Sequence, residues 1–389
     1  MPLINSIAAM TPEITAWRRD LHENPELMYD VHRTAGIVAD KLKAFGCDEI
    51  VPGIGRTGVV GVIRGKTNTS GRVIGLRADM DALPMEELTG LPYASKTKGK
   101  MHACGHDGHT AMLLGAAKYL AETRNFDGTA IVIFQPAEEG GAGGKAMVDD
   151  GMMERWGIQE VYGMHNAPGI PVGQFATRVG SILASADFFF IEIEGKGSHA
   201  AEPHKGIDPL VVGANILLAF QTIVARNLDP LKSGVVTVGS FNGGFATNIV
   251  PQHVKMSGTV RALEPSVRDL LHKRVVETAE AIGTAYGAKV KVDYHRSYPV
   301  TVNHAKETDF AVKVAGGIVG ADKVEPNVTP VMGGEDFSFM LEARPGNVIW
   351  IGNGDTAACH HPAYDFDDAA IPFGVTYWAR LVEQGMPAK

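Results

Sequence analysis

The chain has few cysteines and no excess of basic residues. Its 389 residues include three cysteines, Cys47, Cys104 and Cys359, an odd and sparse set that argues against a disulfide framework. Sparse cysteine is typical of a reducing compartment, where a special cysteine acts as a ligand or a nucleophile. Lysine and arginine number 36 against 44 aspartates and glutamates, which gives a net charge of −8. Because no basic run offsets this charge, we expect no nucleic acid partner.

Long hydrophobic runs, internal repeats and low-complexity segments are also missing. No run approaches the roughly 18 apolar residues that a membrane span needs. The first six residues lack the basic region and long apolar core of a signal peptide. We therefore expect a cytoplasmic protein with no membrane partner. A hydrophobic content of 45% and a charged content of 21% are typical of a soluble globular protein with a large core.

Short runs rich in valine and isoleucine predict strands that are buried on both faces. A first helix is expected to begin at Thr11-Pro12, because Thr is a good N-cap and Pro suits the first helical position. Strands alternating with helices predict an α/β domain with a mostly parallel sheet. The predicted strands are 59–63, 73–76, 130–134, 161–164 and 348–351, and further helices are predicted at 33–45 and 110–123.

The middle of the chain has a different order of elements. From about residue 184 to residue 298 the pattern is β-α-β-β-α-β, which is typical of a ferredoxin-like domain. We therefore predict a catalytic domain made of residues 1–183 and 299–389, with residues 184–298 inserted as a second domain. The elements predicted in the insertion are strands 188–194, 235–241, 254–261 and 290–294 and helices 209–226 and 265–286.

The segment 102–110 is rich in metal-binding side chains. It holds three histidines, one cysteine and one aspartate, and glycines at 105 and 108 allow tight turns. Imidazole and thiolate are preferred zinc ligands, and carboxylate adds a harder oxygen donor. A single cysteine in a mixed set favours a catalytic site with an open coordination position over a structural zinc site. The alternative is a histidine-rich surface loop that binds nothing.

Further candidates follow the predicted strands, at the edge where ligands bind in parallel sheets. Adjacent carboxylates after a buried strand are costly unless a cation neutralises them, so one of Glu138 and Glu139 would bind metal and the other would take a proton. A solvated acidic turn is the alternative for that pair. The candidates are Asp79 and Asp81, Glu138 and Glu139, His165, His199, and the pair His360-His361.

Six segments together resemble the M20 metallopeptidases, and most closely their N-acyl-amino-acid amidohydrolases, such as hippurate hydrolases and aminoacylases. The resemblance covers essentially the whole chain. The matching segments are 17–27, 77–84, 101–110, 135–141, 334–338 and 360–366.

This resemblance implies a zinc-peptidase-like domain with a dinuclear metal centre and an inserted lid and dimerisation domain. Glu138 would be the general base and acid, Asp81 would orient a ligand, and His199 would stabilise the oxyanion. Asn248 and Arg261 would hold the substrate carboxylate. The family's His-x-Pro motif favours His360 over His361. The metal ligands would be Cys104, His106, Glu139, His165 and His360.

The expected activity is hydrolysis of the amide bond in an N-acyl amino acid, with two divalent ions per subunit, most simply zinc, with manganese, cobalt or nickel as alternatives. The expected partners are the small-molecule substrate and further copies of the chain, as a homodimer or homotetramer. One alternative is a metallo-dipeptidase on the same scaffold. Another is a metal- or small-molecule-binding protein without catalysis, which would need no spare carboxylate at Glu138-Glu139.

Overall fold

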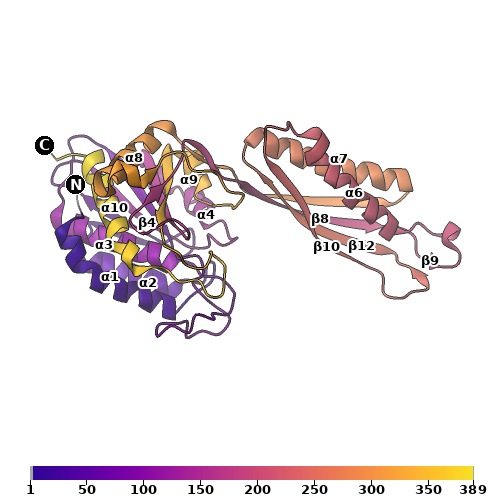
Figure 1. Cartoon of the computed structure of the whole chain (residues 1–389), viewed down its shortest axis with the longest axis horizontal. Coiled ribbons are helices and arrows are strands. Elements are labelled where there is room, and N and C mark those ends of the chain that lie inside the picture. The colour runs from indigo at the N-terminus through magenta and orange to yellow at the C-terminus, as the bar shows by residue number, and fades with distance from the viewer. Residues whose placement is uncertain (1–2, 389) are drawn as a thin grey trace. The chain divides into compact units, whose positions relative to one another are not determined.

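A computed structural model describes residues 3–388, and the chain forms two compact units. Unit 1 contains Met1–Gly180, Val302–Thr329 and Asp336–Lys389, and unit 2 contains Ser181–Thr301 and Pro330–Glu335. Figure 1 shows one unit rich in helices around a sheet and a second built of long strands with helices packed along them.

Unit 1 is built on an eight-stranded mixed sheet, which confirms the predicted α/β class. The central strands β4, β3, β5 and β16 run parallel to one another, whereas β1 and β2 form an antiparallel edge. Every residue of β4 is buried, as its unbroken apolar run predicts. In spatial order the strands are β1 (Glu49–Ile54), β2 (Gly58–Arg64), β4 (Thr129–Gln135), β3 (Val73–Asp79), β5 (Glu160–Ala167), β16 (Gly346–Gly352), β6 (Phe175–Ala176) and β15 (Val324–Glu325).

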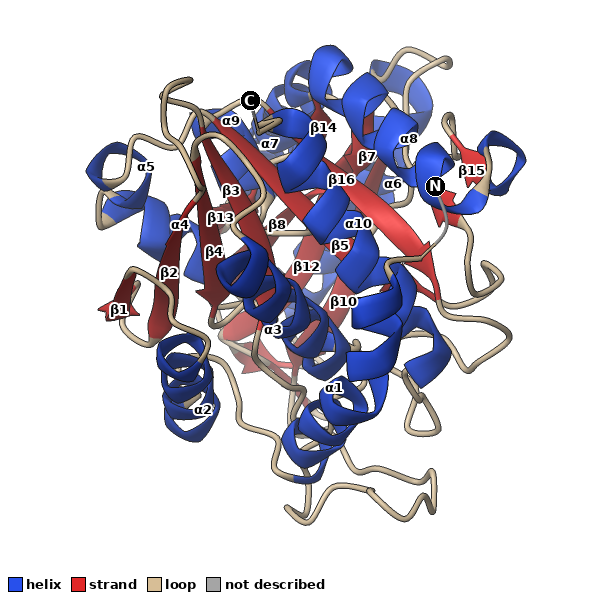
Figure 2. Cartoon of the chain, turned by 90° about the vertical axis from the view of Figure 1, so that its left-hand side faces the viewer, coloured by secondary structure: helices blue, strands red, loops and turns tan. Residues whose placement is uncertain are grey.

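Helices cover this sheet on both faces. Side chains of β4 alternate, so that Val132 and Phe134 join the main core with α1, α3 and α10, which lie in front of the sheet in Figure 2. On β5, Gly163 faces the other way, because a Cβ at that position would lie 3.2 Å from the ring of Phe337 next to α9. The helices of unit 1 are α1 (Asn5–Glu23), α2 (His32–Ala44), α3 (His106–Thr123), α4 (Gly143–Asp149), α5 (Met152–Arg155), α8 (Ala305–Val319), α9 (Ser338–Ala343) and α10 (Ile371–Gly385).

Two predicted helix starts are wrong. Helix α1 begins at Asn5, and Pro12 lies inside it rather than at its first position. Burial of Ile7 on the inward face adds an early turn that the capping signal at Thr11 did not predict. Helix α3 begins at His106 instead of Thr110, so its first turn contains His106 and His109 of the histidine-rich segment.

Unit 2 has the predicted β-α-β-β-α-β order. Four of its strands form an antiparallel sheet in the order β10-β12-β8-β13, and α6 and α7 pack against each other and the sheet. Helix α6 begins with Pro209, capped by the Asp208 carboxylate, which accepts from the Leu210 amide at 2.9 Å. The elements are β8 (Ser185–Glu194), α6 (Pro209–Asn227), β10 (Gly234–Gly243), β12 (His253–Ala262), α7 (Pro265–Tyr286) and β13 (Lys289–Tyr298).

Helix α6 departs from the expectation that no segment is long and apolar enough to cross a membrane. Within its 19 residues, an 18-residue window has a mean hydropathy of 1.5, and 33% of that window is buried. This is weak evidence for a span, because core helices of ordinary domains have the same length and composition. The Phe220 and Ile223 side chains of α6 belong to the core of unit 2.

Candidate metal centre and active site

Three predicted metal ligands come together where α3 begins. The ligand atoms of Cys104, His106 and His165 all lie within 4.8 Å of one another. The His165 Nε2 is 3.4 Å from the Cys104 Sγ. Gly105 makes this approach possible, because its φ is +85° and a Cβ there would lie 2.3 Å from the Asn166 amide nitrogen. The sequence thus places a thiol and two imidazoles at one point.

A second group of candidate ligands shares Cys104. Its members are Cys104, Glu139 and His360, whose ligand atoms also lie within 4.8 Å of one another. A Glu139 carboxylate oxygen is 3.4 Å from the His360 Nε2 and 3.9 Å from the His106 Nε2. Glu139 therefore links the two groups, an arrangement that fits two adjacent ions.

The ring of His106 is set up to bind a cation. Its Nδ1 donates to the main-chain carbonyl of Asp81 at 2.8 Å, which leaves a lone pair on Nε2 in the neutral ring. That Nε2 is buried and has no hydrogen-bond partner among residues 3–388. His165 is fixed in the same way, since its Nδ1 donates to the carbonyl of Asn166 at 2.7 Å. Metal-binding histidines in proteins are oriented by such bonds, so the donor set fits divalent metal ions.

Asp81 positions the Glu138-Glu139 pair. Its two carboxylate oxygens accept from the backbone amides of Glu138 and Glu139, each at 3.0 Å. Burial raises the pKa of the Asp81 carboxyl group. The preceding Ala137 has a φ of +54°, a left-handed conformation that non-glycine residues seldom adopt. Asp81 and this strained turn together hold the pair at the carboxyl end of β4.

The surrounding carboxylates make this region strongly attractive to positive charge. Burial opposes a charge on His106, but Asp79, Asp81 and Glu139 outweigh it and raise the pKa of that imidazole. Burial likewise opposes ionisation of Glu139, but the His360 and His106 rings outweigh it and lower the pKa of this carboxyl group. A divalent cation would balance the same negative charge.

Comparison with known proteins identifies the family. The family model described as peptidase family M20/M25/M40 matches residues 75–384. The chain belongs to this family. It is 42% identical to hippurate hydrolase of Campylobacter jejuni over 98% of both chains. It is 41% identical to N-acetyl-L-cysteine deacetylase of Bacillus subtilis, over 94% of this chain and 86% of the relative. It superposes with a TM-score of 0.84 on a dinuclear metal binding M20 peptidase of Bacillus subtilis, at 33% identity, over 98% of this chain and 100% of the other.

Between the two C-terminal histidines of this M20 chain, His360 lies beside the other predicted ligands. It has a φ of +66°, and its backbone amide donates to the Ala103 carbonyl at 2.7 Å, next to Cys104. The exposed His361 instead accepts a hydrogen bond from the Ala363 amide through its Nδ1 at 3.0 Å. The geometry therefore favours His360, although the ligand assignment as a whole stays a prediction.

Several residues of the M20 site were not assigned a role from the sequence. The His109 Nδ1 lies 2.6 Å from an Asp79 oxygen, and its Nε2 accepts from the Asn166 amide at 2.9 Å. Asn166 also donates to the Cys104 carbonyl at 2.6 Å, and Tyr364 donates to Asn166 at 2.7 Å. These contacts brace the loop of Cys104 and the end of β5. Only the presence of His109 in the 102–110 cluster pointed to them.

Cys359 was also missed. Its thiol contacts that of Cys104, and this contact holds the pKa of Cys359 down, to about 6. Its position directly before His360 was the available signal.

In unit 2, His199 and Asn248 line one pocket of about 550 Å³ around two short strands, β9 (Ser198–His199) and β11 (Ile249–Val250). The Asn248 carbonyl accepts from the Ala200 amide at 3.0 Å. Arg261 does not line this pocket. It lies on β12 with its guanidinium 5.8 Å from the Phe188 ring centroid, and burial lowers the pKa of this guanidinium. The roles predicted for these residues stay predictions.

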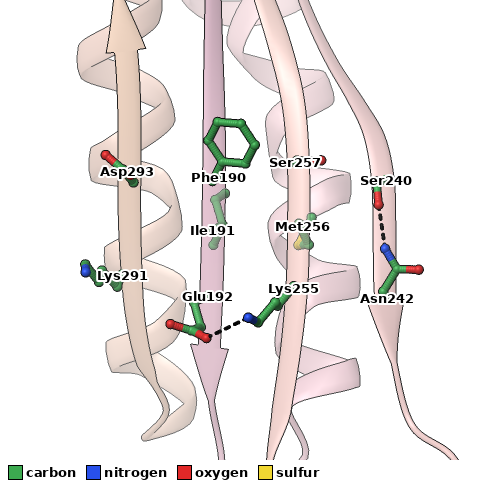
Figure 3. Close-up of a pocket in the computed structure, with 10 residues that line it drawn as sticks. All are labelled: Phe190, Ile191, Glu192, Ser240, Asn242, Lys255, Met256, Ser257, Lys291 and Asp293. Carbon is green, nitrogen blue, oxygen red and sulfur yellow. Dashed lines mark hydrogen bonds and ion pairs between the residues drawn. The ribbon is translucent and has the colours of Figure 1, made fainter.

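A second pocket of unit 2, of about 410 Å³, lies across the four strands of its sheet (Figure 3). None of the predicted site residues lines it. Glu192 on β8 forms an ion pair with Lys255 on β12 at 3.4 Å, and Phe190 is 52% exposed. Among the residues that the structure describes, none of the groups able to hold a metal ion includes a residue of this pocket.

Proposed function

We propose that this chain is a metal-dependent amidohydrolase that cleaves N-acyl amino acids to a carboxylate and a free amino acid. The observation that carries the proposal is the donor set of Cys104, His106, Glu139, His165 and His360 with the additional carboxylate of Glu138 beside it. A protein that only binds metal would not need this carboxylate. The named activities of the hippurate hydrolase and deacetylase relatives support the same class of substrate.

The proposed cofactor is a pair of divalent ions held by these five residues, and the thiolate and imidazole donors favour zinc. When bound, such ions polarise the amide carbonyl and lower the pKa of water. In the proposed mechanism, Glu138 takes a proton from the attacking water and passes it to the leaving amine nitrogen. Asp81 keeps Glu138 and Glu139 in place through their backbone amides. His199 is proposed to stabilise the oxyanion, and Asn248 and Arg261 to bind the substrate carboxylate.

We further propose that unit 2 serves as lid and dimer interface, giving a homodimer or homotetramer. The apolar side chains of Val211 and Leu218 on α6, 47% and 65% exposed, support a contact between copies. Three free cysteines support a reducing, cytoplasmic location.

The test of the function is release of amino acid from hippurate, N-acetylmethionine, an indole-acetyl amino acid and a plain dipeptide, each with and without chelator. Turnover of an N-acylated substrate that chelator abolishes is expected. Turnover of the dipeptide alone would instead make the chain an exopeptidase. No turnover by metal-loaded protein would favour the binding-protein alternative.

The test of the mechanism is Glu138→Gln, which should keep the metals and lose most turnover because the amide cannot take a proton. Glu160→Gln is a matched control, since Glu160 is 9% exposed and begins β5, at the end opposite His165. Full activity of Glu138→Gln would overturn the assignment of the general base.

A further inference from the structure

The thiols of Cys104 and Cys359 face each other although they are far apart in the sequence. Their side chains are in hydrogen-bonding contact. The backbone holds the two loops together, because the amide of His360 donates to the carbonyl of Ala103 at 2.7 Å. Cys104 directly follows Ala103 and Cys359 directly precedes His360, so this backbone hydrogen bond holds the two cysteines near each other.

The pair differs from the third cysteine in its surroundings. Cys359 is partly exposed, and Cys104 is 8% exposed at the predicted metal centre. Cys47 is 9% exposed and belongs to the hydrophobic core just after α2. A small oxidant that reaches Cys359 therefore meets a thiol with a second thiol already beside it.

We propose that Cys104 and Cys359 form a reversible disulfide in the metal-free protein, which removes a metal ligand and blocks metal loading. This inference rests on the proposed function only for the role of Cys104 as a ligand. The oxidant is a hydroperoxide. One thiolate attacks a peroxide oxygen, the O–O bond breaks, and the oxidant leaves as water or an alcohol, giving a sulfenic acid. The second thiol then attacks that sulfur, the S–S bond forms, and the S–O bond breaks with release of water.

The experiment treats the full chain, stripped of metal by chelator, with hydrogen peroxide and then removes the oxidant. Free thiols are counted in denaturant, peptides are mapped by mass spectrometry, and zinc binding is measured with a competing chromophoric chelator before and after reduction by dithiothreitol. We expect two of the three thiols to disappear, a peptide linking residues 104 and 359, and zinc binding that is lost and then restored by the reductant. Zinc-loaded protein should give no peptide linking residues 104 and 359, because the bound ion occupies Cys104.

Two variants separate the disulfide from general oxidation. Cys359→Ser should bind zinc when reduced and should form no disulfide. In this variant a second equivalent of peroxide should carry the Cys104 sulfenic acid to the sulfinic acid, which dithiothreitol does not reduce, so zinc binding is not restored. Cys47→Ser should behave as the unaltered protein does. Absence of the linked peptide, or loss of zinc binding with all three thiols retained, would overturn the proposal. If reduced, unaltered protein binds no zinc, the proposed function is wrong, and the linked peptide still decides whether the disulfide forms.

Discussion

Replacing Asp81 with Asn tests how the Glu138-Glu139 pair is held. The Asp81 carboxylate accepts from two backbone amides, one to each of its oxygens. Asparagine offers one carbonyl oxygen and an NH₂ group, so one buried amide of the pair loses its acceptor. An unpaired buried group costs about 1–3 kcal/mol. If that cost is expressed at the metal centre, affinity for metal falls roughly 5- to 150-fold.

The assay is a zinc titration against a chromophoric chelator, together with turnover of an N-acyl amino acid at saturating zinc. Asp127→Asn is the matched control, because Asp127 also accepts hydrogen bonds from two backbone amides, those of Thr69 and Ser70. Asp127 precedes the first residue of β4, whereas the Glu138-Glu139 pair follows the last. The control should lose thermal stability and keep its zinc affinity. Asp81→Asn with unaltered zinc affinity and turnover would refute the positioning role of Asp81.

Three further predictions concern stability. Gly105→Ala should weaken zinc binding and lower the Tm by more than Gly99→Ala, because both have positive φ but only the former brings a Cβ against Asn166; equal effects in the two variants would contradict this. Hydrogen bonds, first that of the Thr67 hydroxyl, lower the pKa of Asp127 to about 2. This carboxyl group therefore stabilises the fold above its unfolded pKa of about 3.9, and the stabilisation is lost as the pH falls towards 2. Asp127→Asn should flatten the loss of Tm over that range. Asp187 forms an ion pair with Arg268 at 2.6 Å, so Asp187→Ala leaves the Arg268 guanidinium without its partner. This variant should lower the free energy of unfolding in urea titrations by about 3–5 kcal/mol, and a loss below about 1 kcal/mol would contradict the prediction.

The sequence predicted the parts of the fold that depend on local pattern. The apolar runs that became β4 and β5 are buried on both faces, so their composition alone identifies them. The rule that ligands gather at the carboxyl ends of parallel strands predicts that Asp81 and the Glu138-Glu139 pair lie at one edge of the sheet. The start of α1 was missed because tertiary burial of Ile7, rather than a capping residue, extends that helix.

The remaining features depend on contacts between distant parts of the chain. No spacing rule relates Cys104 to Cys359, or Asn166 to Tyr364, because loops between other elements bring them together. The choice between His360 and His361 likewise depends on which ring lies near Glu139. The sequence alone therefore does not tell which of these residues are predicted metal ligands and which hold the ligands in place by hydrogen bonds.

The place of β16 in the sheet has a consequence for synthesis of the chain on the ribosome. This strand, Gly346–Gly352, lies between β5 and β6 in the sheet although it is almost the last element to be made. Until it emerges, one side of β5 is an open, apolar edge that can pair with other chains. Any product that stops before Gly346 keeps that edge and also lacks His360. Premature termination should therefore yield aggregating fragments rather than partly active enzyme.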